Sequence, residues 1–192
     1  MTTDQAVALF SIGVLVAVLV FLTLETYNAV VALRLRIDKA WANIDVALKQ
    51  RHDMLPALVA AVRDLMQFEQ DVLVDVTRAR AAYSPTESIP AQAAVSDATT
   101  SAVRSLFAVV EQYPNIRAQG NVLDLQNEIE RLEGMIADRR ELYNDQVYRY
   151  NARIAQVPAV ILAAIFGWRA RPFFEASDAD RSRPTASLEA SS

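Results

Sequence analysis

Few side chains in this sequence could perform chemistry. The 192 residues contain a single histidine, His52, and no cysteine. Thiolate metal sites, iron–sulfur clusters, disulfides and cysteine nucleophiles are therefore excluded, as is a site built from several histidines of one chain. His52 lies in the run QRHDMLP, where a general base would need a partner, a pocket and a place for the substrate. We interpret it instead as a histidine at a polar helix end that forms hydrogen bonds or faces solvent.

The other candidates for chemistry are the carboxylates of residues 122–157. Di-iron proteins place such groups inside a helical bundle and add a Glu-x-x-His step, which this sequence lacks. Arginines alternate with the acids, and two spacings are typical of ion pairs on a helix surface, Glu128–Arg131 and Asp145–Arg149. We therefore predict a solvated face with no metal, no cofactor and no catalytic residue, and we expect that the protein is not an enzyme. The acids are Asp124, Glu128, Glu130, Glu133, Asp138, Glu141 and Asp145.

One arginine of this segment is placed differently from the others. Arg139 falls on the apolar stripe between Ile136 and Tyr143. A charge on a buried stripe needs a partner. We therefore hypothesise that Arg139 forms a buried ion pair with Asp38 or Asp45.

A run of aromatic and amide residues follows in the same segment. YNDQVYRYN, residues 143–151, places two tyrosines seven residues apart and two asparagines seven residues apart. We expect Tyr143 and Tyr150 to pack in or near the core. Asn144 and Asn151 could fix the helix register or bind a partner, as polar residues at heptad spacing do.

The N-terminal segment has the composition of a membrane anchor. Residues 5–24 carry no charge, and at about 1.5 Å per residue they reach roughly 30 Å, the thickness of a hydrocarbon core. A secretory signal peptide would have a basic start and a shorter apolar run. Arg34, Arg36 and Lys39 follow the segment, and no Lys or Arg precedes it. We therefore predict a single-pass anchor over residues 1–25 in the cell membrane, with the N-terminus outside and the remainder cytoplasmic.

The pattern of the remaining chain is helical. Between the prolines, apolar residues recur at steps of three and four over four stretches, and no long segment alternates with the period of two. We therefore predict an all-α fold: the N-terminal transmembrane helix, then an antiparallel four-helix bundle with long helices over residues 26–157. Residues 84–90 form a loop, and the fourth helix runs from Val122 to Val157. We expect a turn near Pro56, with Asp53 as the cap of the next helix; one long helix kinked at this proline is the alternative.

Residues 158–175 are apolar again at first but too short to cross a bilayer. They pack on the end of the bundle, which we favour, or lie in the membrane interface beside the anchor. Residues 176–192 lack apolar periodicity, which predicts a disordered tail. The candidate interaction or membrane-interface residues are Leu162, Ile165, Phe166, Trp168, Arg169, Arg171 and Phe173.

Two long motifs resemble those of the LemA family. The first is YNAVVALRLRIDKAWANIDVALKQRHDMLPALV, residues 27–59, and the second is NEIERLEGMIADRRELYNDQVYRYNARIAQVPAVILAAIFGWRARPFFE, residues 127–175. With the anchor, the resemblance extends over roughly residues 5–175. It implies an antiparallel helical bundle on one membrane helix in the prokaryotic cell envelope, and it implies no established activity, cofactor or catalytic residue.

The function expected from these features is structural. A net charge of −4 argues against nucleic acid as a partner. The anchor and the long helices favour a membrane-anchored scaffold or adaptor, which presents helical faces to other envelope proteins or to copies of itself. Gly13 and Ala17 form a weak small-xxx-small motif through which anchors could pack in a homo-oligomer. The alternative is a membrane-organising protein that inserts residues 158–174 into the lipid leaflet.

Overall fold

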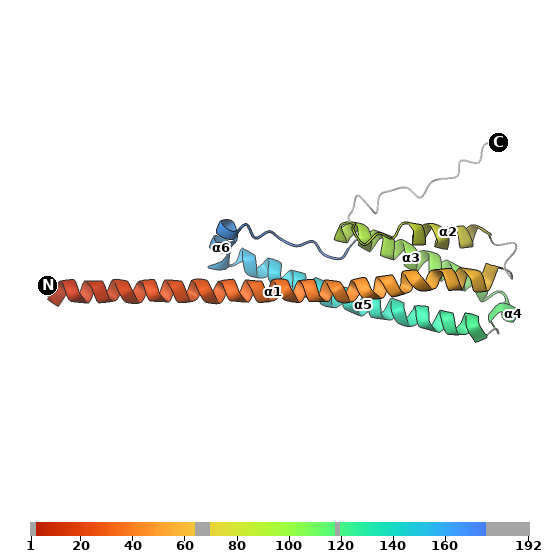
Figure 1. Ribbon diagram of the computed structural model, residues 1–192, viewed down its shortest axis with the longest axis horizontal. Helices are drawn as coiled ribbons and strands as arrows, with labels where there is room; N and C mark the ends of the chain where they lie inside the picture. The colour runs from red at the N-terminus through yellow and green to blue at the C-terminus, as the bar shows by residue number, and fades with distance from the viewer. Residues whose placement is uncertain (1–2, 64–69, 118–119, 176–192) are drawn as a thin grey trace, which may run out of the picture. The chain divides into compact units, whose positions relative to one another are not determined.

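The computed structural model describes residues 3–63, 70–117 and 120–175. Within these ranges every regular element is an α-helix and no strand is present, so the all-α prediction is confirmed. The predicted disordered tail lies outside the described residues. The helix predicted from Val122 to Val157 is α5. The helices are α1 (Thr3–Arg63), α2 (Gln70–Ala81), α3 (Ile89–Val110), α4 (Pro114–Arg117), α5 (Gly120–Ala155) and α6 (Ala159–Phe166) (Figure 1).

The chain divides into two compact units, which are described separately. The anchor unit comprises Met1–Ala40 and Asn144–Arg171, and the core unit comprises Trp41–Tyr143 and Pro172–Ser192. Helices α1 and α5 contribute to both units, α6 belongs to the anchor unit, and α2, α3 and α4 belong to the core unit. The division predicted from the sequence, after residues 25, 157 and 175, stays a prediction.

The expected turn at Pro56 is wrong, because α1 continues through this proline. A proline inside a helix removes one backbone hydrogen bond and costs about 3 kcal/mol. Beyond it, however, α1 buries Leu58 and Val62 as well as Leu55 just before it. Each such side chain contributes about 1.5–3 kcal/mol when it is buried, which outweighs the lost hydrogen bond. Asp53 accordingly lies inside α1 and does not begin a helix.

The hydrophobic core of the core unit receives one face from each of α1, α2, α3 and α5. Leu58, Val76, Leu106 and Ile129, one from each helix, are fully buried in it. Ser88 is the N-cap of α3, and its hydroxyl accepts a backbone N–H of the first turn. The loop predicted before α3 therefore ends two residues earlier than expected.

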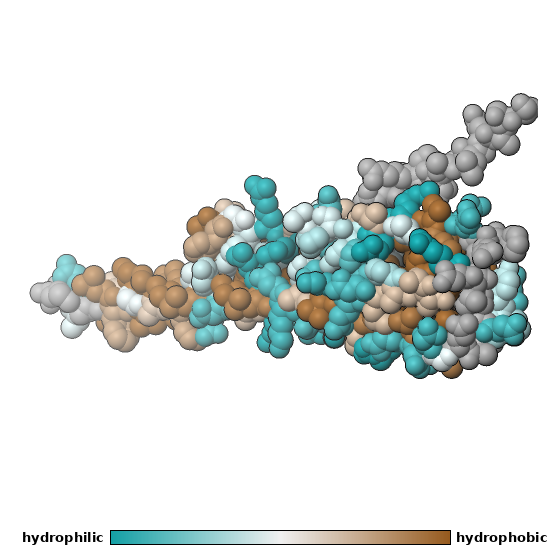
Figure 2. Space-filling view, turned by 45° about the vertical axis from the view of Figure 1, so that its right-hand side comes forward, coloured by the Kyte–Doolittle hydropathy of each residue, from teal (hydrophilic) through white to brown (hydrophobic). Residues whose placement is uncertain are grey.

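The first part of α1 has the character of a membrane span. An 18-residue window of this helix is apolar enough to cross a membrane, and none of the window is buried. The space-filling view shows the visible side of this segment as largely hydrophobic (Figure 2). Contiguous exposed apolar surface of this extent marks an interaction site or a membrane site. The long N-terminal apolar helix is therefore a candidate membrane span, as the sequence predicts.

Candidate functional site

The anchor unit holds α6 with most of its apolar side chains facing outward. Ala159 and Leu162 are buried, whereas Ile165 is 68% exposed and Phe166 is 51% exposed. The helix ends at Gly167, whose φ of 66° is a conformation that glycine adopts without strain. An eight-residue helix is marginal by itself, so its buried side and its termination must hold it in place. The exposed apolar residues of this segment are Val157, Val160, Ile161, Ile165 and Phe166.

An aromatic cluster joins the end of α6 to α1. The turn at Gly167 directs the Trp168 N–H to a carbonyl of α6, at 2.9 Å. The ring centroid of Tyr27 lies 5.2 Å from that of Phe166 and 5.8 Å from that of Trp168, and the latter two are 5.5 Å apart. Tyr27 follows the uncharged segment by three residues, roughly 4.5 Å along the helix, which is the depth of the headgroup region. Tyrosine and tryptophan are enriched at that depth, so the cluster has the composition of an interfacial anchor.

The seven residues predicted from sequence for this interface occupy different environments. Most face outward from the anchor unit, one packs inward, and one belongs to the core unit. Ile165, Phe166 and Arg169 are exposed, Trp168 and Arg171 are half-buried, Leu162 is buried, and Phe173 lies at the surface of the core unit. The structure thus brings the outward residues of α6 together with Trp168 and Arg169, and it removes Leu162 from the exposed set.

The tyrosine and asparagine run of α5 holds the segment that follows α6. Tyr150 is buried, and its hydroxyl donates to the carbonyl of Arg169 at 3.1 Å. The amide of Asn151 donates to the carbonyl of Arg171 at 3.0 Å and accepts the N–H of the same residue at 2.9 Å. In the core unit, the hydroxyl of the buried Tyr143 donates to the carbonyl of Pro172 at 3.0 Å. The predicted packing of both tyrosines is confirmed, and Asn151 binds its own chain.

Phe174 packs into the core unit, and it was not among the residues predicted from the sequence to be important. Its side chain is fully buried in the core unit, whereas the neighbouring Phe173 is exposed. The ring lies 5.8 Å from that of Trp41, and the guanidinium of Arg140 stands 5.5 Å from its centroid. Two adjacent phenylalanines give no signal in the sequence of which one packs inward.

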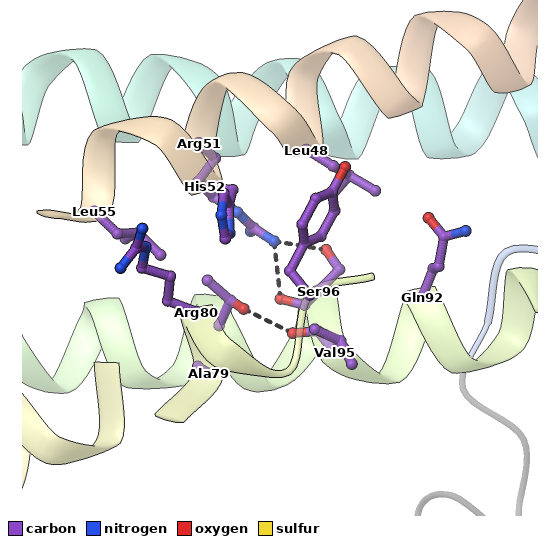
Figure 3. A pocket seen from close by; sticks show the side chains of 11 residues that line it. Leu48, Arg51, His52, Leu55, Ala79, Arg80, Gln92, Val95 and Ser96 are labelled. Atoms are coloured by element: carbon purple, nitrogen blue, oxygen red, sulfur yellow. Dashed lines mark hydrogen bonds between the residues drawn. The ribbon is translucent and has the colours of Figure 1, made fainter. Parts of the chain in front are cut away.

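A buried arginine ties three helices of the core unit together. Arg51 of α1 is 3% exposed, and its guanidinium donates to the carboxylate of Glu133 on α5 at 2.6 Å. It also donates to the hydroxyl of Ser96 on α3 at 3.0 Å (Figure 3), and to the hydroxyl of Thr100 on the same helix at 3.0 Å. The Thr100 hydroxyl in turn donates to the second oxygen of Glu133 at 2.6 Å. A buried charge with its hydrogen bonds satisfied in this way tolerates the loss of a partner poorly.

The buried ion pair predicted for Arg139 is wrong. Its guanidinium is half-buried and donates to the main-chain carbonyl of Asn43 at 2.7 Å. The two proposed partners are engaged elsewhere: Asp38 pairs with Arg171 at 3.6 Å in the anchor unit, and Asp45 accepts a hydrogen bond from a tyrosine. Arg139 lies where α1 and α5 meet at the surface, so its charge remains partly hydrated. A hydrogen bond to a main-chain carbonyl is therefore sufficient, and the charge needs no carboxylate partner.

His52 follows the buried Arg51 and is half-buried within α1, not at a helix end as expected. Its ring lies 4.7 Å from that of Tyr83, whose hydroxyl donates to Asp45 at 3.5 Å. Burial raises the pKa of Tyr83, and the charge and hydrogen bond of Asp45 raise it further. His52 and Arg51 line a cavity of only about 10 Å³ (Figure 3), far below the roughly 300 Å³ of the smallest usual ligand pockets. The geometry therefore suits helix packing better than substrate binding.

Most carboxylates of α5 lie on a solvated face, as predicted, but Glu133 does not: it is half-buried and pairs with the buried Arg51, because α1 and α3 bring a guanidinium and a hydroxyl to it. The predicted pairs are present: Arg131 bonds Glu128 through two nitrogens, and Arg149 pairs with Asp145 at 2.8 Å. The hydrogen bond from Arg131 lowers the pKa of Glu128. Among residues 3–63, 70–117 and 120–175, no group of three or more His, Asp or Glu side chains is placed to hold a metal ion.

A second exposed surface lies on α1 and α5 of the core unit, and we call it the α1–α5 face. It consists of Val46, Met135, Arg139 and Leu142. Val46 is 53% exposed and Leu142 is 60% exposed, and each follows by three residues one partner of the Arg139–Asn43 hydrogen bond that joins the two helices. Leu142 lies two residues from Arg140, which pairs with α3. Two residues turn an α-helix by about 200°, so the α1–α5 face points away from α3.

Comparison with known proteins identifies the family. The profile of the LemA family matches residues 40–187, most of the chain. This chain belongs to the LemA family. The resemblance seen in the two long motifs is thereby confirmed, although the match begins after the apolar segment of α1. LemA membership and the candidate span together indicate a membrane-associated protein.

Two curated relatives share part of the sequence. They are magnetosome proteins MamQ 1 and MamQ 2 of Paramagnetospirillum magneticum (strain ATCC 700264 / AMB-1), each 36% identical to this LemA protein over 74 residues. The matched stretch covers 38% of this chain and 27% of each relative. The chain thus spans about a quarter of the length of these relatives.

Proposed function

We propose that this LemA protein is a membrane-anchored, non-catalytic helical scaffold or adaptor of the prokaryotic cell envelope. Its span would hold an antiparallel bundle of α1, α2, α3 and α5 at the membrane, where helical faces meet envelope proteins or further copies of the chain. The α1–α5 face carries the proposal. It offers one exposed apolar side chain from each of two helices, Val46 and Leu142, which suits another helix, and the half-buried Met135 and Arg139 belong to residue types that are enriched at protein interfaces.

Site-specific crosslinking tests the scaffold. The natural chain has no cysteine, so Val46→Cys and Leu142→Cys each introduce a single attachment point for a photoreactive maleimide. Glu130→Cys is the matched control, because this exposed residue lies on α5 about 120° around the helix from Leu142. We expect adducts in native membranes at the first two positions and few at the third. Background levels at all three positions would contradict the proposal.

The native mass of the full chain in mild detergent separates the two kinds of partner. A discrete multimer that loses mass in the Leu142→Glu variant supports self-association through the α1–α5 face. A monomer that still forms crosslinks in membranes supports an adaptor with a foreign partner. A monomer that forms no crosslinks would contradict both self-association and binding to a foreign partner.

The orientation that we propose places the N-terminus outside and the core unit in the cytoplasm. Arg34, Arg36 and Lys39 follow the span within about 15 residues. Single cysteines at Thr3 and Glu87 test this orientation with a maleimide that cannot cross membranes. Labelling of the Thr3→Cys variant alone in intact spheroplasts is the expected result, and labelling of the Glu87→Cys variant alone would reverse the orientation.

A second candidate function is membrane organisation through α6. The observation that favours it is the aromatic cluster of Tyr27, Phe166 and Trp168 close to the end of the span, beside the outward apolar side chains of α6. These side chains suit the headgroup and acyl boundary, where amphipathic segments insert. We propose that α6 lies in that boundary, as a second point of membrane attachment.

Tryptophan quenching tests the insertion of α6 in the full chain. The sequence has two tryptophans, Trp41 and Trp168. In the Trp41→Phe variant, we expect brominated lipids to quench Trp168 most strongly when bromine is high on the acyl chain. In the Trp168→Phe variant, Trp41 is the control, because it lies 17 residues beyond Leu24, roughly 25 Å along α1. If Trp168 is quenched no more than Trp41, α6 does not insert.

A further inference from the structure

We propose that the anchor unit binds anionic phospholipid headgroups, with Arg169 as the side chain that contacts them and Arg34 as a nearby charge that attracts them. This inference rests on the second candidate function, the insertion of α6, and names the lipid class that the same site prefers. It begins from an unequal distribution of charge between the two units.

The anchor unit is basic although the whole chain is acidic. It contains seven Lys and Arg against four Asp and Glu, a net charge of +3, whereas the core unit contains twelve against nineteen, a net charge of −7. Two of the seven cations are occupied, because Arg149 pairs with Asp145 and Arg171 pairs with Asp38. None of the ion pairs between described residues involves Arg34 or Arg169, and both side chains are exposed.

Arg169 stands at the depth of the lipid headgroups if α6 inserts. It directly follows Trp168, whose ring contacts Tyr27 just beyond the span. Its backbone is fixed, because its carbonyl accepts the hydroxyl of Tyr150 at 3.1 Å, while its side chain remains exposed. A fixed backbone beneath a free guanidinium leaves the charge available for a ligand at the surface.

Arg34 lies on the same side of α1 as the aromatic cluster. Seven residues separate it from Tyr27, which brings it back to nearly the same helical face. It follows Leu24 by ten residues, roughly 15 Å along the axis, and helical side chains lean toward the N-terminus, here toward the membrane. Its charge therefore comes within about one Debye length of the phosphates, whose layer adds roughly 5–7 Å to the hydrocarbon core.

The chemistry of these two groups selects the lipid. A guanidinium binds phosphate through two parallel N–H···O bonds and keeps its charge at every physiological pH. A zwitterionic lipid offers the same phosphate but adds a compensating cation, so an anionic headgroup is preferred. Each basic residue near an anionic surface increases lipid association by roughly fivefold. The core unit, with its net charge of −7, is repelled by an anionic surface.

Lipid-specific quenching in the full chain tests the inference. The Trp41→Phe variant is reconstituted into phosphatidylcholine that contains either brominated phosphatidylglycerol or, at the same mole fraction, brominated phosphatidylcholine. We expect Trp168 to be quenched several-fold more efficiently by the anionic lipid, and we expect high salt to reduce this excess. Arg34→Gln together with Arg169→Gln should abolish most of the excess, whereas the matched pair Lys49→Gln and Arg104→Gln, exposed cations of the core unit, should leave it unchanged.

The outcomes separate this inference from the function on which it rests. Equal quenching by the two lipids overturns the headgroup preference and leaves the insertion of α6 intact. An excess that survives the Arg34 and Arg169 substitutions likewise overturns the assignment of these residues. Absence of quenching by either lipid overturns the insertion of α6 and the headgroup preference with it.

Discussion

The two units of this LemA protein use the same residue types in opposite ways. The core unit buries its apolar side chains among four helices and encloses a charge, Arg51, that its own hydrogen bonds satisfy. The anchor unit exposes the apolar side chains of its span and of α6, and hydrogen bonds to main-chain carbonyls hold the segment that follows α6. This contrast fits our proposal that the anchor unit lies at a boundary between water and lipid.

The strongest test of this contrast is the removal of one apolar side chain from each unit. Leu58 of the core unit is completely buried, whereas Ile165 of the anchor unit is largely exposed. Leu58→Ala should lower the free energy of unfolding by about 2–5 kcal/mol, because it leaves a cavity. Ile165→Ala should change it by less than about 0.5 kcal/mol in detergent. Urea unfolding of the full chain, followed by circular dichroism, measures both values. Similar losses would mean that α6 packs on protein.

A charge pair from each unit provides the next comparison. Glu133→Leu leaves the guanidinium of Arg51 buried without its anion, which should cost about 3 kcal/mol. Asp38→Asn breaks the exposed pair with Arg171 and should cost less than about 1 kcal/mol. Both are measured by the same urea titration.

The double variant Arg51→Met with Glu133→Leu distinguishes a buried charge from a merely crowded site. Replacing both members of a buried pair with apolar residues is often neutral. We therefore expect the double variant to recover most of the stability that Glu133→Leu loses. Losses that simply add would show that the two side chains do not interact energetically.

The elements of the fold were largely predictable, because their signals are local. The uncharged run of residues 5–24, the period of α5 and the apolar segment of α6 are each visible within one stretch of sequence. The continuation of α1 through Pro56 was not predictable in this way. The cost of a proline is local, whereas the burial that outweighs it depends on side chains from α2 and α3.

The buried arginine shows a limit of a different kind. Arg51 lies on the apolar stripe between Leu48 and Leu55, just as Arg139 lies between Ile136 and Tyr143. The same spacing is present at both, yet a buried pair was predicted only for Arg139, and only Arg51 is buried. What decides the outcome is whether neighbouring helices bring a carboxylate and hydroxyls to the guanidinium. No spacing within a single helix contains that information.

A smaller effect is expected from the amide that holds the segment after α6. Asn151→Ala removes both hydrogen bonds to Arg171, at about 1 kcal/mol each. We expect the Arg171 amide to exchange its hydrogen at least tenfold faster, while the core unit keeps its protection. Asn28→Ala, at an exposed position of the same unit, is the control. It should change neither the exchange rate of the Arg171 amide nor the protection of the core unit. An unchanged Arg171 amide would mean that the rest of the anchor unit holds this segment without Asn151.

The smallest expected effect concerns pH and belongs to the core unit. Burial and Asp45 raise the pKa of Tyr83 in the folded state, so folding favours the protonated hydroxyl. Its contribution to stability is complete below the ordinary tyrosine pKa of about 10 and is lost as pH rises above that value. The stability difference between the natural chain and Tyr83→Phe should therefore be constant below about pH 10 and narrow above it. In an Asp45→Asn background the narrowing should still begin at about pH 10, but it should be smaller and end at a lower pH, because the neighbouring charge no longer raises the folded pKa of Tyr83. A difference that widens with pH would show that the hydroxyl is stabilised as phenolate, contrary to its placement beside a carboxylate.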